Sequence, residues 1–256
     1  MNPFSLEGSR GLVIGIANNQ SIAWGCAQAL AAQGATLAVT YLNEKAEPHV
    51  RPLAEKLDAP IILPCDVTHP GELEAVFEAV QSRWGKLDFA LHAIAYARKD
   101  DLYGRYLDCS ADGFAHAMSV SCHSFLRMAR LAEPLMKAGG CLLTLTFSGS
   151  ERYMPGYGVM GPAKAALECS VKYLAAELGA QGIRVNALSA GPIRTRAASG
   201  IPDFDALQGE MVKRTFIGRP VTIEEVGQAA AFLVSRAARA TTGTIHYVDG
   251  GLHQSG

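Results

Sequence analysis

The chain has 256 residues, of which 49% are hydrophobic and 18% are charged. Such a high apolar content excludes a disordered chain, and a single α/β domain spanning residues 1–256 is expected because such domains reach about 250 residues. The net charge of −1 provides no general attraction for nucleic acid or anionic lipid. Glycine is frequent: it makes up 26 of the 256 residues, or about 10%, whereas ~7% is usual. This excess indicates tight turns or close backbone approaches.

Signals for secretion, membrane insertion and metal binding are missing from the sequence. Residues Met1–Glu7 lack the basic and apolar regions of a secretory signal, and no apolar run approaches the ~18 residues that span a bilayer. We therefore expect a cytoplasmic protein without membrane contact. The cysteines form no Cys-x-x-Cys pair and the histidines no His-x-x-x-His pair, so neither a disulfide framework nor a metal site is expected.

Short β-branched runs alternate with helix-length segments along the whole chain. Strands are expected at 12–16, 35–40, 61–63, 87–94, 141–147, 183–188 and 244–248, and helices at 21–33, 44–57, 71–84, 110–137, 161–180, 204–213 and 223–236. The early strands are nearly continuous apolar runs, which is typical of parallel strands covered on both faces. The pattern predicts an α/β fold with a doubly wound parallel sheet of Rossmann type, with about seven strands and helices on both faces. A closed eight-fold barrel is the alternative, and seven strands fit it less well.

The turn after the first strand resembles a dinucleotide-phosphate site only in part. It lacks the G-x-G-x-x-G pattern and keeps glycine at Gly15 alone. Gly15 permits a tight turn, Ser21 is suited to cap the next helix and to bind a pyrophosphate, and Ala23 permits close helix–sheet packing. An ordinary strand-to-helix turn explains the same residues equally well.

The residues after the second and third strands bear on the choice of cofactor. Tyr41–Lys45 contains neither the well-placed acid that binds the NAD ribose nor the arginine that suits the NADP phosphate. The missing arginine favours NADH over NADPH. Asp66 and Val67 are suited to an adenine ring, although Asp66 is equally suited to a simple turn.

The segment from Tyr153 to Lys164 contains the strongest chemical signal. Lys164 follows Tyr157 by seven positions, which is close to two helical turns, and Pro162 suits the first turn of a helix that includes Lys164. Gly156 and Gly158 leave Tyr157 free to lean over that helix start. An ammonium beside a phenol is expected to lower the phenol pKa. An amphipathic helix with an interfacial tyrosine and a surface lysine is the alternative.

Four motifs in order give this pair a context: Gly15 to Ala23, Tyr157-x6-Lys164, Val185 to Thr195, and Val248-Asp249-Gly250-Gly251. Together they resemble the short-chain dehydrogenase/reductase superfamily. Met160 stands where the common Tyr-x3-Lys pattern would require tyrosine. The chain is therefore more similar to a divergent branch, the bacterial enoyl-acyl-carrier-protein reductases of fatty acid synthesis.

The resemblance implies hydride transfer from NADH to the β-carbon of a trans-2-enoyl thioester. It implies that Tyr157 and Lys164 are catalytic, that Ala97, Phe147 and Tyr157 line the substrate site, and that about 193–214 forms a substrate lid. It also implies a homotetramer. The implied cofactor contacts are Gly15, Ser21, Ile22, Asp66, Val67, Ile94, Lys164, Ile193, Arg194, Thr195, Arg196 and Ala197.

Three positions depart from the pattern of this branch. Phe147 replaces a second tyrosine, and Leu42 replaces a polar residue that often meets the adenosine ribose. The segment Pro202–Glu210 has three acids and no bases, whereas an acidic acyl carrier protein would favour a basic surface. The carrier protein and coenzyme A therefore both remain open as substrate carriers. A carbonyl reductase or alcohol dehydrogenase of the same superfamily, and a non-catalytic dinucleotide-binding protein, are the alternative functions.

Overall fold

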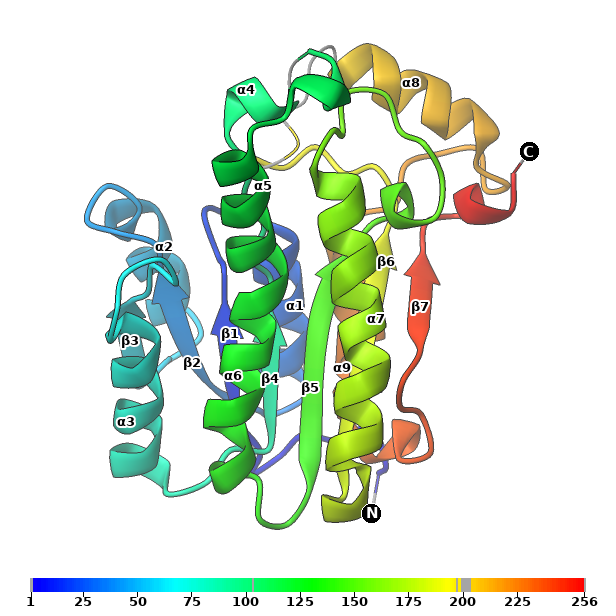
Figure 1. Cartoon of the computed structure of the whole chain (residues 1–256). Coiled ribbons are helices and arrows are strands. Elements are labelled where there is room, and N and C mark those ends of the chain that lie inside the picture. The colour runs from blue at the N-terminus through cyan, green and yellow to red at the C-terminus, as the bar shows by residue number, and fades with distance from the viewer. Residues whose placement is uncertain (1, 103, 197, 199–203, 256) are drawn as a thin grey trace.

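The computed structural model describes residues 2–102, 104–196, 198 and 204–255. The described residues include seven strands, all parallel, in the order β3-β2-β1-β4-β5-β6-β7 (Figure 1). The strands are β1 Arg10–Ile14, β2 Thr36–Tyr41, β3 Ile61–Pro64, β4 Phe89–His92, β5 Gly140–Thr146, β6 Ile183–Ala190 and β7 Ile245–Val248. This topology confirms the predicted doubly wound sheet and places its switch point between β1 and β4.

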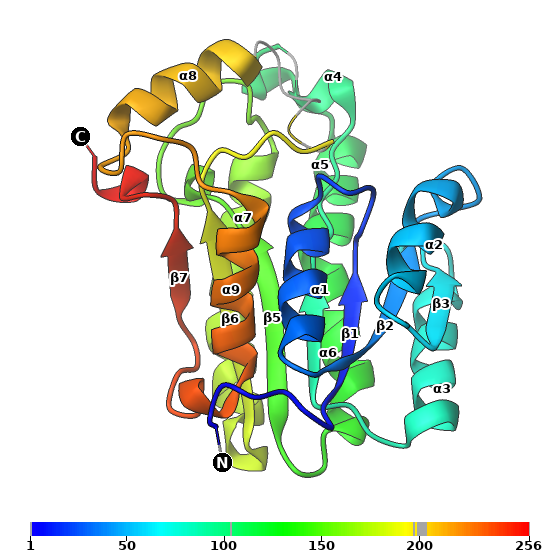
Figure 2. The same ribbon diagram turned by 180° about the vertical axis from the view of Figure 1, so that it is seen from behind.

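Helices cover both faces of the sheet. Figure 1 shows α3, α5, α6 and α7 on one face, and Figure 2 shows α1, α2 and α9 on the other. Each layer buries its own apolar cluster against the strands. The helices are α1 Ile22–Ala32, α2 Glu47–Glu55, α3 Glu72–Trp84, α4 Lys99–Leu102, α5 Ala111–Met118, α6 Ser124–Ala132, α7 Met160–Leu178, α8 Phe204–Arg214 and α9 Ile223–Val234.

The helix predicted at 110–137 is interrupted in the structure. A π-helical turn, Ser119–His123, separates α5 from α6, and a 3-10 turn, Glu133–Leu135, follows α6. The Ser124 hydroxyl donates to the Val120 carbonyl at 2.6 Å and lies 2.7 Å from Nε2 of buried His92. Such π turns are often found at functional sites, and the residue that follows this one bonds to His92 of β4, a partner that local sequence does not reveal.

Two further elements differ from the sequence prediction. The strand expected at 87–94 is shorter, because β4 ends at His92, and the helix α4 was not predicted. Helix α8 lies over the carboxyl edge of the sheet (Figures 1 and 2). Within the described part of the chain, no helix has the length and apolarity needed to cross a membrane.

Candidate active site

The predicted pair of Tyr157 and Lys164 lies at the carboxyl edge of the sheet, where α7 begins. Helix α7 starts at Met160, so Lys164 lies in its first turns and Tyr157 precedes it by three residues. The glycines on either side of Tyr157 have positive φ angles of 71° and 42°. This confirms the predicted freedom of the backbone at Tyr157, although the tyrosine itself is outside the helix.

Lys164 is buried, with 5% of its surface exposed, and its Nζ donates to the Leu145 carbonyl of β5 at 2.8 Å. Burial lowers the pKa of Lys164 to about 8, and the negative charge of Glu168 partly opposes this shift. The side chain is thus a buried cation at neutral pH and not the surface lysine of the alternative interpretation.

The ring of Tyr157 packs against two residues of the segment that follows β5. Phe147 lies edge-on to it, with ring centroids 5.2 Å apart. Gly149 lies so close that a Cβ there would be 2.6 Å from the ring. Burial, followed by the charge of Glu168, raises the Tyr157 pKa above its usual value. The prediction that Lys164 lowers this pKa is therefore wrong for this structure: desolvation of the phenol dominates, and the hydroxyl stays protonated as a donor.

A small apolar cluster adjoins the pair. Ala97, predicted for the substrate site, is buried in it together with Ala117, Val159 and Met160. The half-buried side chains packed against this cluster are Leu102, Cys109 and Tyr157. The structure therefore brings Ala97, Tyr157 and, through the ring contact, Phe147 into one region.

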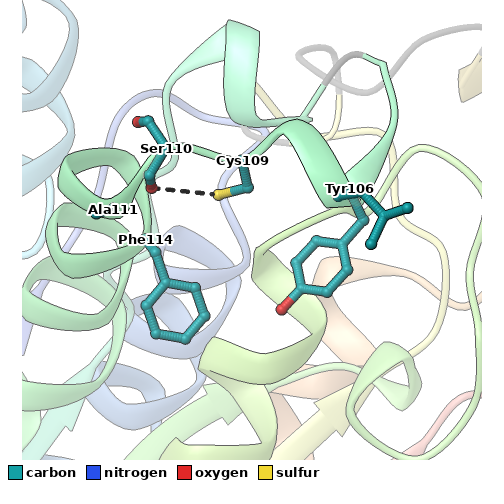
Figure 3. A pocket seen from close by; sticks show the side chains of 6 residues that line it. Tyr106, Cys109, Ser110, Ala111 and Phe114 are labelled. Carbon is teal, nitrogen blue, oxygen red and sulfur yellow. Dashed lines mark hydrogen bonds between the residues drawn. The ribbon is translucent and has the colours of Figure 1, made fainter.

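A hollow of about 480 Å³ lies beside this cluster (Figure 3). It is lined by Tyr106, Leu107, Cys109, Ser110, Ala111 and Phe114. Cys109 belongs to both the hollow and the cluster, so the two are adjacent. Buried Asp101 accepts from the amide of Ser110 at 3.3 Å and fastens this loop to the start of α5.

Several polar residues under the site were not predicted from the sequence. His92 is fully buried between Thr144 and Ser124 hydroxyls, and burial lowers its pKa to about 3, so it is neutral. Ser121 of the π turn accepts from the Tyr96 amide at 3.0 Å and donates to its carbonyl at 3.1 Å. These contacts fix the backbone just before Ala97. Only the tertiary fold identifies them.

In the turn after β1, the backbone at Gly15 lies close to the backbone that follows β4, as the glycine suggests. Gly15 has φ +110°, and a Cβ there would lie 2.2 Å from the Ala93 carbonyl oxygen. Ser21 occupies the N-cap position of α1, but the predicted capping bond is wrong: its hydroxyl accepts from the amides of Ala17 and Asn18, both at 3.0 Å. The hydroxyl organises the turn. The Trp24 and Gly25 amides donate to the Ser21 carbonyl, so Ile22 and Ala23 carry the first-turn amides of α1 that have no backbone partner among the described residues.

The remaining predicted cofactor residues lie along the same edge. Asp66 follows β3, and its Oδ1 accepts from the Thr68 amide and hydroxyl at 2.9 and 2.7 Å, so it does serve as a turn residue. Val67 is buried beside it, and half-buried Ile94 follows β4. The Asp66 turn after β3 and the Gly15 turn after β1 therefore lie on either side of β2 at the carboxyl edge of the sheet.

The predicted lid follows β6. Ile193 packs against the core, Arg194 forms an exposed ion pair with Asp205 of α8, and Thr195 accepts from the Ala198 amide. Exposed Arg196 lies beside them, and Gln208 of α8 donates to the Pro192 carbonyl at 2.8 Å. Ala197, also predicted for the cofactor, lies outside the described residues.

The two remaining departures also have structural counterparts. Leu42 is 52% exposed directly after β2. On α8, Lys213 pairs with Glu210 at 2.6 Å, and Arg194 pairs with Asp205. These two bases are therefore engaged by acids of α8 itself.

Comparison with known proteins decides the family. The family model described as enoyl-(acyl carrier protein) reductase matches residues 15–253. The chain belongs to this family. Among curated relatives, an enoyl-acyl-carrier-protein reductase (NADH) of Rhizobium meliloti is 52% identical, over 96% of this chain and 92% of the relative. Its counterpart in Bacillus subtilis is 47% identical over 98% of both chains.

Solved structures agree with this assignment. The reductase of Anaplasma phagocytophilum, crystallised in complex with NAD, superposes with a TM-score of 0.94 at 48% identity and covers 98% of this chain and 96% of that one. The reductase of Aquifex aeolicus gives 0.95 at 42% identity, with 98% of each chain covered. The family resemblance seen in the four motifs is confirmed, and the cofactor named for these relatives agrees with the expectation of NADH.

Proposed function

We propose that this chain is an enoyl-thioester reductase that transfers hydride from NADH to the β-carbon of a trans-2-enoyl substrate. The observation that supports this best is the half-buried Tyr157 and the buried Lys164 at the carboxyl end of β5, with Tyr157 packed against an apolar cluster that includes Ala97. A protonated phenol, a buried ammonium and an apolar surface are the groups that an enoyl thioester and a nicotinamide ribose require.

The residues at the switch point fit a dinucleotide. The missing Cβ of Gly15 lets the turn after β1 lie against Ala93, and Ser21 turns its hydroxyl into that turn. This leaves the amides at the start of α1 to bind a pyrophosphate, because a helix N-terminus favours anions. Ile22, Asp66, Val67, Ile94 and the described residues Ile193–Arg196 would complete the site, and Lys164 would bind the nicotinamide ribose.

The chain's own groups then have separable tasks. The bound cofactor supplies the hydride. Tyr157 donates its hydroxyl proton in a hydrogen bond to the thioester oxygen, on which negative charge develops as an enolate. Lys164 would hold the hydroxyls of the nicotinamide ribose and so help to orient the bound cofactor. Ala97 and Met160 pack against the acyl group and exclude water, while Phe147 supports the Tyr157 ring without adding a hydroxyl of its own.

Carrier, assembly and lid are further parts of the proposal. The acyl carrier protein is the carrier in the names of the relatives, and we propose it here, with coenzyme A thioesters as the simpler substrate. We also propose a single domain with a lid at about 193–214, a homotetramer and a cytoplasmic location, as the family resemblance implies.

The test is the loss of NADH absorbance at 340 nm with purified protein. Crotonyl-coenzyme A, an enoyl thioester on acyl carrier protein, and a panel of ketones are offered separately, each with NADH and with NADPH. We expect turnover of the enoyl thioesters with NADH. Turnover of ketones alone would instead establish a carbonyl reductase, and tight NADH binding without any turnover would establish a non-catalytic binding protein.

A further inference from the structure

We propose that Glu168 is a positioning residue for both members of the catalytic pair, holding the turn that supports Tyr157 and keeping Lys164 in its cationic form. This inference rests on the proposed reductase function and extends it by one residue. Glu168 lies on α7, one helical turn after Lys164, and is 7% exposed. A carboxylate is rarely buried to this extent unless it is bound by other groups.

The first role follows from two hydrogen bonds. Thr146, the last residue of β5, and Ser150 both donate their hydroxyls to Oε1 of Glu168, at 2.5 and 2.6 Å. Between them lies the 3-10 turn Ser148–Ser150, and its Gly149 packs on the ring of Tyr157. The carboxylate therefore anchors both ends of the segment against which Tyr157 rests.

The second role follows from the register of α7 against β5. The carbonyl of Leu145 accepts from Lys164, and the hydroxyl of the next residue, Thr146, donates to Glu168. One strand end thus holds the buried cation and the buried anion one helical turn apart, where side chains at i and i+4 are neighbours.

The charges around Lys164 leave Glu168 as its main support. The neutral carbonyl of Leu145 accepts its bond, and His92 on β4, whose pKa is lowered by burial and by Lys164, is neutral. On the π turn, Cys122 has a pKa raised by burial, so its thiol is uncharged. The charge of Glu168 raises the pKa of Lys164 against the effect of burial.

Glu168 has its own neighbours. Burial raises the pKa of Glu168 above its usual value, and the charge of Glu151 in the segment after β5 adds to this, whereas the two hydroxyls and Lys164 oppose it. The Tyr247 hydroxyl on β7 bonds to Glu151. Hydrogen bonds from two hydroxyl donors favour the ionised carboxylate, which is the form that supports a cation.

The experiment compares Glu168→Gln with Glu168→Asp, and uses Glu151→Gln as a matched control. Glu168→Gln keeps the shape and an acceptor oxygen but loses the charge, whereas Glu168→Asp keeps the charge on a shorter arm. Glu151→Gln removes a nearby charge that is not in the pair. The NADH dissociation constant by fluorescence, kcat/KM and the melting temperature are measured from pH 6 to 10.

In the wild type we expect NADH affinity and kcat/KM to fall as the pH rises through about 8, where Lys164 loses its proton. We call this fall the basic limb of the pH profile. Glu168→Gln should shift the midpoint of this limb to a lower pH by about one unit, so that NADH affinity and kcat/KM at pH 8 are each about fivefold lower than in the wild type. Glu168→Asp should melt at a lower temperature and keep the wild-type limb, and Glu151→Gln should also keep it.

An unshifted limb in Glu168→Gln, or equal shifts in the Gln and Asp variants, would overturn the proposal. If Glu168→Gln does not fold, Glu168→Asp decides alone, because a shifted limb there contradicts a role for the charge. A wild type that binds no NADH and oxidises none refutes the proposed function itself, whereas an active wild type with an unshifted Gln variant refutes only the role of Glu168.

Discussion

Gly15→Ala perturbs the point where the turn of the cofactor site meets the end of β4. The added Cβ would lie 2.2 Å from the Ala93 carbonyl oxygen, well inside the 3.4 Å at which ordinary contact begins. The backbone at Gly15 and the backbone at Ala93 cannot move apart easily, because the Ala93 amide donates to the Ile14 carbonyl and joins the end of β4 to β1. Displacing packed atoms costs about 1–3 kcal/mol, and the positive φ of Gly15 adds about 1–2 kcal/mol for an L-residue.

A matched control separates strain from clash. Gly8 also has a positive φ, +76°, but a Cβ there would meet nothing within 4 Å. Replacing glycine by alanine also lowers the conformational entropy of the unfolded chain, which stabilises the folded protein by about 0.4–1 kcal/mol. With this gain subtracted, Gly8→Ala should lower the free energy of unfolding by about 1 kcal/mol and Gly15→Ala by about 2–4 kcal/mol. In a chain of this size these values correspond to losses in melting temperature of roughly 2–4 °C and 5–15 °C.

The assay joins thermal unfolding with NADH titration. Gly15→Ala should weaken NADH binding at least about tenfold, or ~1.4 kcal/mol, since it displaces the turn that precedes α1. Gly8→Ala should bind NADH like the wild type. Equal melting temperatures for the two variants, or wild-type NADH affinity in Gly15→Ala, would refute the role assigned to this contact.

Three further predictions concern the catalytic pair and its neighbour. Tyr157→Phe should lower kcat about 10²–10³-fold, because the enolate loses a donor, while NADH affinity and melting temperature stay near wild type; an unchanged kcat would contradict the mechanism. Phe147→Tyr should lower KM for the enoyl thioester about two- to tenfold, because the new hydroxyl can bond the substrate. A change confined to NADH affinity would show that the ring at this position lies at the cofactor and not at the substrate. Lys164→Met should bind NADH more weakly at pH 7 and without the wild-type weakening through pH 8. Burial lowers the Lys164 pKa from 10.5 to about 8 in the folded protein, so between these pH values the unfolded chain binds the extra proton. The free energy of unfolding of the wild type should therefore rise from pH 8 to 10.5, in contrast to its weakening affinity for NADH. In Lys164→Met this rise in the free energy of unfolding should be absent.

The fold was predictable where local pattern and burial agree. The apolar runs of β1, β2 and β5 and the glycine after β1 indicate parallel strands and a tight turn, and the structure has both. The start of α7 was placed well because Pro162 is tolerated only in a first turn.

What the sequence did not reveal depends on partners distant in the chain. Ser124, which follows the π turn and bonds back to its Val120, also bonds to His92, which lies 32 residues earlier in the chain. The protonated state of Tyr157 depends on burial by the segment after β5, whereas the spacing of Tyr157 and Lys164 suggested only attraction. Glu168 is visible in the sequence as the residue four positions after Lys164, but its hydroxyl partners on β5 and the following turn become evident only when α7 is packed on the sheet.

The most direct test of the central claim follows the hydride itself. Wild-type protein is given crotonyl-coenzyme A and NADH carrying deuterium at the transferable C4 position, and the product is examined by mass spectrometry and NMR. The account predicts one deuterium at the β-carbon of butyryl-coenzyme A and a solvent proton at the α-carbon. A product without label, or label on a carbon that bears oxygen, would contradict it.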